Sequence, residues 1–173
     1  MIPNQLVYLS STRFNAYEFI ATPDSLFMLV WGGSYGHLAD LQSISAPLMY
    51  FFNQHNNVRI EIMGDPQFAV PFPFLPAHKF CFFSAGSLVN YLSLLDHLHK
   101  CIAPLLPTEY YCCRSDVKFL EYASHSVFPL LQDLDTFDYL IDTESAFLFS
   151  NNSEFIYKLT SFFVALSLVN CCF

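Results

Sequence analysis

Short apolar runs alternate with helical patterns along most of this chain. Between the runs, apolar residues recur every three or four positions, as they do on one face of a helix. Consecutive strands that are joined through helices pair in parallel, because a parallel neighbour is reached only by a crossover connection. We therefore predict an α/β protein with a doubly wound parallel sheet of about six strands. The predicted strands are residues 26–31, 58–63, 79–83, 101–105, 127–131 and 146–149.

The segments between these strands contain the predicted helices and loops. Helical spacing predicts helices at residues 38–53, 87–98 and 153–163, the second with Ser87 as its N-cap. Residues 66–76 contain repeated prolines, which favour a loop with at most a broken helix. Residues 137–141 are expected to form a short segment before the last strand.

One further helix is of special interest for function. We expect Ser115 or Asp116 to cap it, with Val117 on the buried face and Lys118 and Tyr122 on the opposite, exposed face. Its start follows a loop and its end leads into the strand at 127–131, so its free N–H groups and positive dipole suit an anion such as a diphosphate. Glu121 can accept hydrogen bonds from the hydroxyl groups of a ligand. It can equally be the surface ion-pair partner of Lys118, three residues before it.

Composition narrows the functional classes. Apolar residues make up 54% of the chain and charged residues 13%, so a large core is available. The formal net charge is −8 and there are only seven Lys and Arg residues, which argues against nucleic-acid binding. No cationic and apolar signal opens the chain, so we place it in the reducing cytoplasm and expect its six cysteines to be thiols. The Cys112-Cys113 and Cys171-Cys172 pairs lack zinc-site spacing, and no metal is expected.

The apolar character is high for a free-standing domain. The chain contains 20 phenylalanines, which suggests an apolar surface that another part of a larger protein covers. Residues 159–173 carry no charge, but fifteen residues are too few for a membrane span. We interpret them as the end of a helix or an aberrant tail; a tail anchor, or peripheral association with a membrane, is the alternative.

Five short motifs follow one another along the chain. They are Ile2-Pro3-Asn4, Trp31-Gly32-Gly33, Ile62-Met63-Gly64-Asp65, Ala103-Pro104, and residues 114–123 followed by Val127-Phe128-Pro129-Leu130-Leu131. In this order they resemble the C-terminal, nucleotide-sugar-binding domain of group-1 glycosyltransferases, which have the two-domain GT-B fold. The last motif is the most specific. The resemblance implies a donor-binding domain at residues 1–165, with 1–25 as its leading segment, and an apolar tail at 166–173.

The resemblance implies transfer of a sugar from a nucleotide donor to an acceptor hydroxyl, with retention as in the family. Glu121 would hold the ribose hydroxyls, the backbone at residues 115–117 would face the diphosphate, and the turn at residues 32–34 would approach the phosphates. No catalytic residue is assigned, and no cofactor or metal is implied beyond the nucleotide-sugar substrate. The residues expected to bind the donor are Gly32, Gly33, Ser34, His37, Arg114, Ser115, Asp116, Val117, Lys118 and Glu121.

The chain departs from the family pattern in three respects. Cys113 stands where many members have a glutamate that contacts the donor sugar. The Arg and Lys that usually follow the first strand are replaced by Gly33 and by His37 or its neighbours. Arg114 or His37 would then have to supply the cation that stabilises a diphosphate leaving group. The N-terminal acceptor-binding domain is also absent from the sequence, so we interpret the chain as a fragment whose partner is that domain or another chain.

Two other functional classes are weighed against this one. The pattern Gly32-x-Ser34-x-Gly36 occurs after a strand and before a helix, as in the nucleophile elbow of serine hydrolases. However, in that fold the histidine must follow the acid, for which Asp133 or Asp135 could serve, and no histidine follows His125. A hydrolase sheet also needs several strands before the elbow, and none is predicted before the strand that leads into it. The other class is a non-catalytic nucleotide-sugar-binding domain or a degenerate one, which the lost basic pair and the absent partner domain favour.

Overall fold

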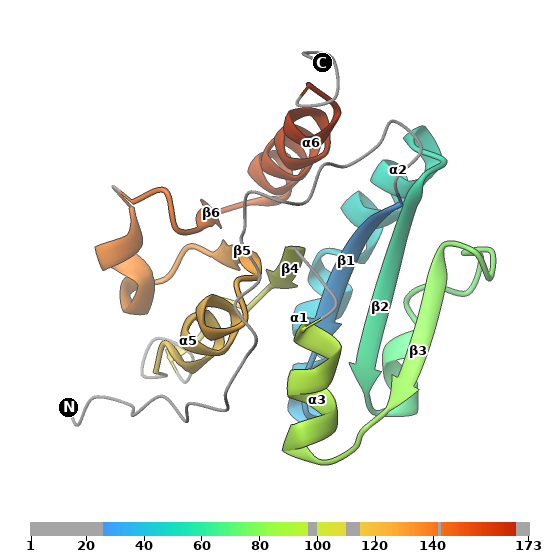
Figure 1. The fold of residues 1–173 in the computed structure, drawn as a ribbon, viewed down its shortest axis with the longest axis horizontal. Coiled ribbons are helices and arrows are strands. Elements are labelled where there is room, and N and C mark those ends of the chain that lie inside the picture. The colour runs from blue at the N-terminus through green and yellow to red at the C-terminus, as the bar shows by residue number, and fades with distance from the viewer. Residues whose placement is uncertain (1–25, 97–99, 110–114, 142, 169–173) are drawn as a thin grey trace.

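The computed structural model describes residues 26–96, 100–109, 115–141 and 143–168. Its strands form one six-stranded sheet in the order β3-β2-β1-β4-β5-β6, and every neighbouring pair is parallel (Figure 1). This confirms the predicted doubly wound parallel sheet, and each predicted strand is found within two residues at either end. The strands are β1 (Phe27–Gly32), β2 (Val58–Gly64), β3 (Phe80–Ser84), β4 (Lys100–Ala103), β5 (Phe128–Gln132) and β6 (Phe147–Phe149).

The order of the strands reverses between β1 and β4. The chain runs outward from β1 through β2 to β3, then crosses to β4 on the other side of β1 and continues to β5 and β6. Because all strands are parallel, their carboxyl ends lie at one edge of the sheet. In open α/β sheets ligands bind outside this edge, at the point where the strand order reverses. That point lies beyond Gly32, the last residue of β1, and Ala103, the last residue of β4.

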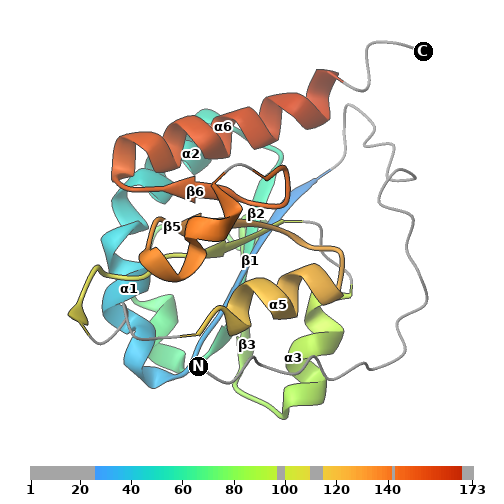
Figure 2. The ribbon, with the colours of Figure 1, turned by 90° about the vertical axis from the view of Figure 1, so that its left-hand side faces the viewer.

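Helices cover both faces of the sheet (Figure 2). On one face α1 (Leu38–Ser43), α2 (Ser45–Gln54) and α6 (Asn152–Leu168) pack on a core that includes Leu29 and Ile60. On the other face α3 (Leu88–Leu95) and α5 (Val117–Ser124) pack on a core that includes Val30 and Leu131. Successive residues of β1 therefore enter opposite cores, as expected for a strand that is buried on both faces.

The helix predicted at residues 38–53 is divided in two. Helix α1 ends at Ser43, Ile44 adopts a non-helical backbone, and α2 begins at Ser45. The reason is Pro47, which lacks an N–H group and whose ring would clash with the carbonyl of Ser43 in a continuous helix. Proline is tolerated in the first turn of a helix, which is where α2 contains it.

The prediction of the buried face of α5 is wrong. Tyr122, which was expected on the exposed face, is 1% exposed, whereas Val117 is 42% exposed. Tyr122 packs in the same core as Val127 and Leu131. The helix is short, and its sequence contains apolar or aromatic residues on more than one side. Contact with the sheet therefore decides which of them is buried.

The other elements agree more closely with expectation. Ser87 is the N-cap of α3, and its hydroxyl accepts a hydrogen bond from the Asn90 N–H. The proline-rich loop contains a short 3-10 helix, η2 (Pro66–Ala69), and a second one, η3 (Asp135–Leu140), precedes β6. Helix α6 extends to Leu168, five residues beyond its predicted end at 163. Among the described residues, no helix combines the length and the apolar character needed to cross a membrane.

Candidate donor site at the carboxyl ends of β1 and β4

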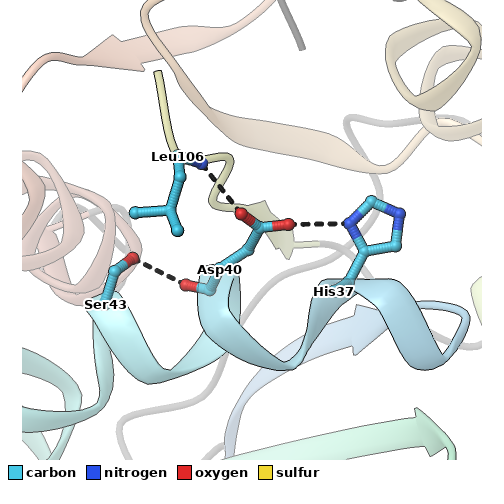
Figure 3. Close-up of polar contacts among 4 residues, drawn as sticks. All are labelled: His37, Asp40, Ser43 and Leu106. Atoms are coloured by element: carbon cyan, nitrogen blue, oxygen red, sulfur yellow. Dashed lines mark hydrogen bonds and ion pairs between the residues drawn. The ribbon is translucent and has the colours of Figure 1, made fainter. Parts of the chain in front are cut away.

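A buried carboxylate connects the segment after β1 to the segment after β4. Asp40 in α1 is 1% exposed. One of its oxygens lies 2.8 Å from His37 Nδ1, and the other accepts a hydrogen bond of 2.8 Å from the Leu106 N–H (Figure 3). Leu106 follows β4, so this one side chain bridges the point at which the strand order reverses. The arrangement holds His37, a predicted site residue, beside that point.

Tyr91 of α3 lies against the last residue of β1. A Cβ atom added at Gly32 would come within 2.6 Å of Cε2 in the Tyr91 ring. Any side chain at position 32 would therefore displace the tyrosine. The absence of a side chain at Gly32 has a packing reason in this structure, in addition to the phosphate contact that the sequence predicts for the turn.

Tyr91 also contacts the helix that carries the predicted ribose-binding residue. Lys118 Nζ donates a hydrogen bond of 2.9 Å to the Tyr91 hydroxyl and lies 3.1 Å from Glu121 Oε2. The same nitrogen is 4.4 Å from the centroid of the Tyr91 ring. Three predicted residues, Gly32, Lys118 and Glu121, are thus brought together through a tyrosine that the sequence analysis did not select.

The phenols in this cluster stay neutral at ordinary pH. Burial, followed by the charge of Glu121, raises the pKa of the Tyr91 hydroxyl far above its usual value. Burial likewise raises the pKa of Tyr122, and it raises the pKa of the neighbouring Cys101 thiol. These groups therefore act as hydrogen-bond partners and not as anions or nucleophiles. The chemistry that the cluster offers is binding of hydroxyl and anionic groups by one ammonium and one carboxylate.

The other two glycines of the turn differ in the space around them. At Gly33 an added Cβ would lie 2.8 Å from the Trp31 ring, while at Gly36 it would meet nothing within 4 Å. Ser34 is exposed and has an extended backbone, with φ of −79°. It lacks the strained turn that characterises a hydrolase nucleophile elbow. The described structure thus offers no support for the serine-hydrolase alternative.

The start of α5 differs from the predicted cap. Asp116 occupies the N-cap position, but its side chain makes no capping hydrogen bond. Its carboxylate instead accepts a hydrogen bond of 2.9 Å from the Tyr139 hydroxyl, and burial together with this bond raises the pKa of Tyr139. Ser115 is exposed at the same end of the helix, beside Val117. The N–H groups of this first turn have no intrahelical acceptors, as at any helix start.

Arg114 and Cys113 lie outside the described residues, so their predicted roles stay predictions. Among the described residues, no group of three His, Cys, Asp or Glu side chains is arranged to hold a metal ion.

Sequence reasoning missed Asp40 and Tyr91. A lone acidic residue in an otherwise apolar helical stretch was a usable signal for Asp40, since such a residue is buried only when it has hydrogen-bond partners. The sequence contains no comparable signal for Tyr91.

Comparison with known proteins shows the fold but no close relative. No protein-family model matches the sequence, and no curated protein matches it. A putative UDP-N-acetylglucosamine 2-epimerase from Listeria monocytogenes superposes with a TM-score of 0.61 at 10% identity, over 85% of this chain and 39% of that one. The UDP-GlcNAc 2-epimerase from Neisseria meningitidis, solved with UDP-GlcNAc bound, gives 0.57 at 12% identity, over 90% and 41%. The structure of TarM gives 0.63 at 9% identity, over 86% and 31%.

These matches agree with the resemblance that the sequence motifs indicate. The chain has the Rossmann-like fold of one half of a GT-B protein. It spans between 31% and 41% of the length of the three structures.

Proposed function

We propose that this chain is the donor-binding domain of a GT-B type glycosyltransferase and holds a nucleoside diphosphate-sugar beyond the carboxyl ends of β1 and β4. The observation that carries the proposal is the cluster of Tyr91, Lys118 and Glu121 against Gly32. It adjoins the point of strand-order reversal, where open α/β sheets bind their ligands. The Neisseria epimerase of the same fold was solved with UDP-GlcNAc, which supports a nucleotide-sugar as the ligand class.

In this proposal the site residues divide the ligand between them. The Glu121 carboxylate accepts hydrogen bonds from the ribose hydroxyls. The turn at Gly33 and Ser34 and the free N–H groups at the start of α5 face the diphosphate, where the helix dipole favours negative charge. No metal or other cofactor takes part. The sugar is transferred, with retention, to an acceptor hydroxyl that a second domain or partner chain presents.

The test is the substitution Glu121→Gln, studied by calorimetric titration of uridine diphosphate and guanosine diphosphate. The substitution keeps the shape of the side chain but weakens two charge-assisted hydrogen bonds, each worth roughly 1.5–3 kcal/mol. Whichever of the two diphosphates wild type binds, the affinity of Glu121→Gln for it should be at least about tenfold lower, because 1.4 kcal/mol corresponds to one decade in the dissociation constant. The fold should survive, since a surface ion pair such as Lys118–Glu121 contributes about 0–1 kcal/mol.

Glu144→Gln is the matched control, because Glu144 is exposed in the loop before β6. It should bind as wild type does. Equal affinities of wild type and Glu121→Gln would show that Glu121 is only the surface partner of Lys118. If wild type binds neither diphosphate, the proposed donor site itself is wrong.

A further inference from the structure

The described chain offers few cations for a diphosphate. Five Lys and Arg side chains lie in the described residues, and four of them are engaged away from the point where the strand order reverses. Lys79 donates hydrogen bonds to the carbonyls of Phe52 and His55 at the end of α2. Lys100 lies over the rings of Phe128 and Phe162. Lys158 donates a hydrogen bond to the Leu148 carbonyl, and Arg59 forms an ion pair with Glu61 in β2. The fifth is Lys118.

Lys118 is held close to the end of β1 by the tyrosine described above. Its Nζ lies 2.9 Å from the hydroxyl of Tyr91, whose ring in turn fills the space above Gly32. The side chain keeps 30% of its surface exposed, so a ligand can reach the ammonium group without unfolding the helix. An ammonium group that is partly desolvated and tethered at one point loses little further freedom on binding an anion, which favours affinity.

We propose that Lys118 is a cation of the donor site and that it exchanges the Glu121 carboxylate for a phosphate oxygen when a nucleoside diphosphate binds. This inference rests on the proposed function. Lys118 Nζ keeps its hydrogen bond to Tyr91 and moves from Glu121 Oε2, 3.1 Å away, to the diphosphate. The exchange frees the carboxylate for the ribose hydroxyls. One ion pair is thus replaced by two ligand contacts, so that Lys118 and Glu121 are engaged by the same ligand.

Tyr91 is the positioning residue in this exchange. Its hydroxyl accepts a hydrogen bond from Lys118 Nζ, and the centroid of its ring lies 4.4 Å from the same nitrogen. A neutral phenol adds no negative charge that would compete with the phosphates for the ammonium group. It therefore orients Lys118 without neutralising it, whereas a carboxylate in the same place would weaken phosphate binding.

The experiment compares a nucleoside diphosphate with its parent nucleoside on wild type, Lys118→Met, Lys118→Arg and Tyr91→Phe. Lys118→Met should lose about tenfold or more in affinity for the diphosphate, the loss expected for one charge-assisted hydrogen bond. Its affinity for the nucleoside should not fall, because the Glu121 carboxylate is already free of the ion pair in this variant. Lys118→Arg should recover part of the loss, and Tyr91→Phe should lose several-fold in diphosphate affinity only. Glu121→Gln, in contrast, should weaken binding of both ligands, because the ribose is common to them.

Arg59→Gln removes the same unit of charge from the amino end of β2 and should leave both affinities unchanged. Thermal unfolding of each variant checks that the fold is kept. If Lys118→Met binds the diphosphate as wild type does, this inference is overturned while the proposed function stands. If wild type binds no diphosphate, the proposed function is wrong, and the inference that rests on it is overturned as well. Equal losses for nucleoside and diphosphate in Lys118→Met would also overturn the inference, because they would indicate a general disturbance of α5.

Discussion

Ser126 has a backbone conformation that its side chain disfavours. Its φ is 57°, the one non-glycine positive φ among the described residues. Helix α5 ends at Ser124, and the reversal at Ser126 lets the Val127 N–H donate a 2.9 Å hydrogen bond to the Tyr122 carbonyl. Left-handed residues of this kind commonly end helices, and glycine is the usual choice. Here the turn aims the chain from α5 directly into β5, so the strained residue connects the candidate site helix to the sheet.

We expect Ser126→Gly to raise the free energy of unfolding by about 0.5–1 kcal/mol. Relief of the left-handed strain is worth about 1–2 kcal/mol, and it exceeds the extra backbone entropy of glycine, about 0.5–1 kcal/mol. Urea unfolding followed by circular dichroism measures the difference. The matched substitution Ser124→Gly changes the last helical residue of α5 and should lower stability by about 0.5 kcal/mol. A loss of stability in Ser126→Gly would show that the serine side chain itself contributes at this turn.

At the scale of elements, one carboxylate holds α1 against the segment after β4. Asp40 and Leu106 are 66 residues apart in the chain, and the hydrogen bond between them is partly buried. Burial of a carboxylate is costly unless it is hydrogen bonded, and Asp40 has partners for both oxygens. The contact therefore stabilises the relative position of two elements that border the candidate site.

Asp40→Ala should lower the free energy of unfolding by about 1–3 kcal/mol, because it leaves the Leu106 N–H without its acceptor. Asp40→Asn should lower it less, since the amide oxygen can still accept that hydrogen bond. Both are measured by urea unfolding at neutral pH, with diphosphate affinity recorded in parallel. If Asp40→Ala were as stable as wild type, the bridge between α1 and the β4 segment would have no energetic role.

At the scale of the molecule, four exposed apolar side chains lie at the carboxyl edge of the sheet. Phe83 at the end of β3 is 36% exposed, and Leu88 and Val89 at the start of α3 are 59% and 62% exposed. Val117 at the start of α5 is 42% exposed. Lys118 and Tyr91 join these two helices, so the starts of α3 and α5 belong to one region of the surface. This apolar region borders the proposed donor site.

We expect the isolated chain to bind an apolar fluorescent dye and to self-associate at high concentration, because exposed apolar surface promotes both. The double substitution Leu88→Ser and Val89→Glu should reduce dye fluorescence and association without lowering helix content. Tyr157→Ser provides the comparison, since Tyr157 is 71% exposed on α6, on the other face of the sheet. A wild-type chain that stays monomeric and binds no dye would contradict the expectation.

The class of fold follows from local patterns along the chain. Runs such as Val58–Gly64 and Phe128–Gln132 are too short for helices and are separated by helical patterns, so crossover connections and parallel pairing follow from the connectivity alone. The same local signals identified the Ser87 cap and the glycine turn after β1. Such features depend on neighbours in the chain, and this is why a single sequence is sufficient to predict them.

Which side chains meet depends on how distant segments pack together. Tyr91 and Lys118 are 27 residues apart, and nothing in either segment indicates that a tyrosine ring over Gly32 would hold the lysine. The burial of Tyr122 and the Asp40–Leu106 bridge arise in the same way, whereas the break at Ile44 has a local cause in Pro47. A helical period specifies that one face is buried, but the choice among competing faces depends on the shape and hydrogen-bonding groups of the element packed against it. Those partners come from distant parts of the chain and are set only when the sheet assembles.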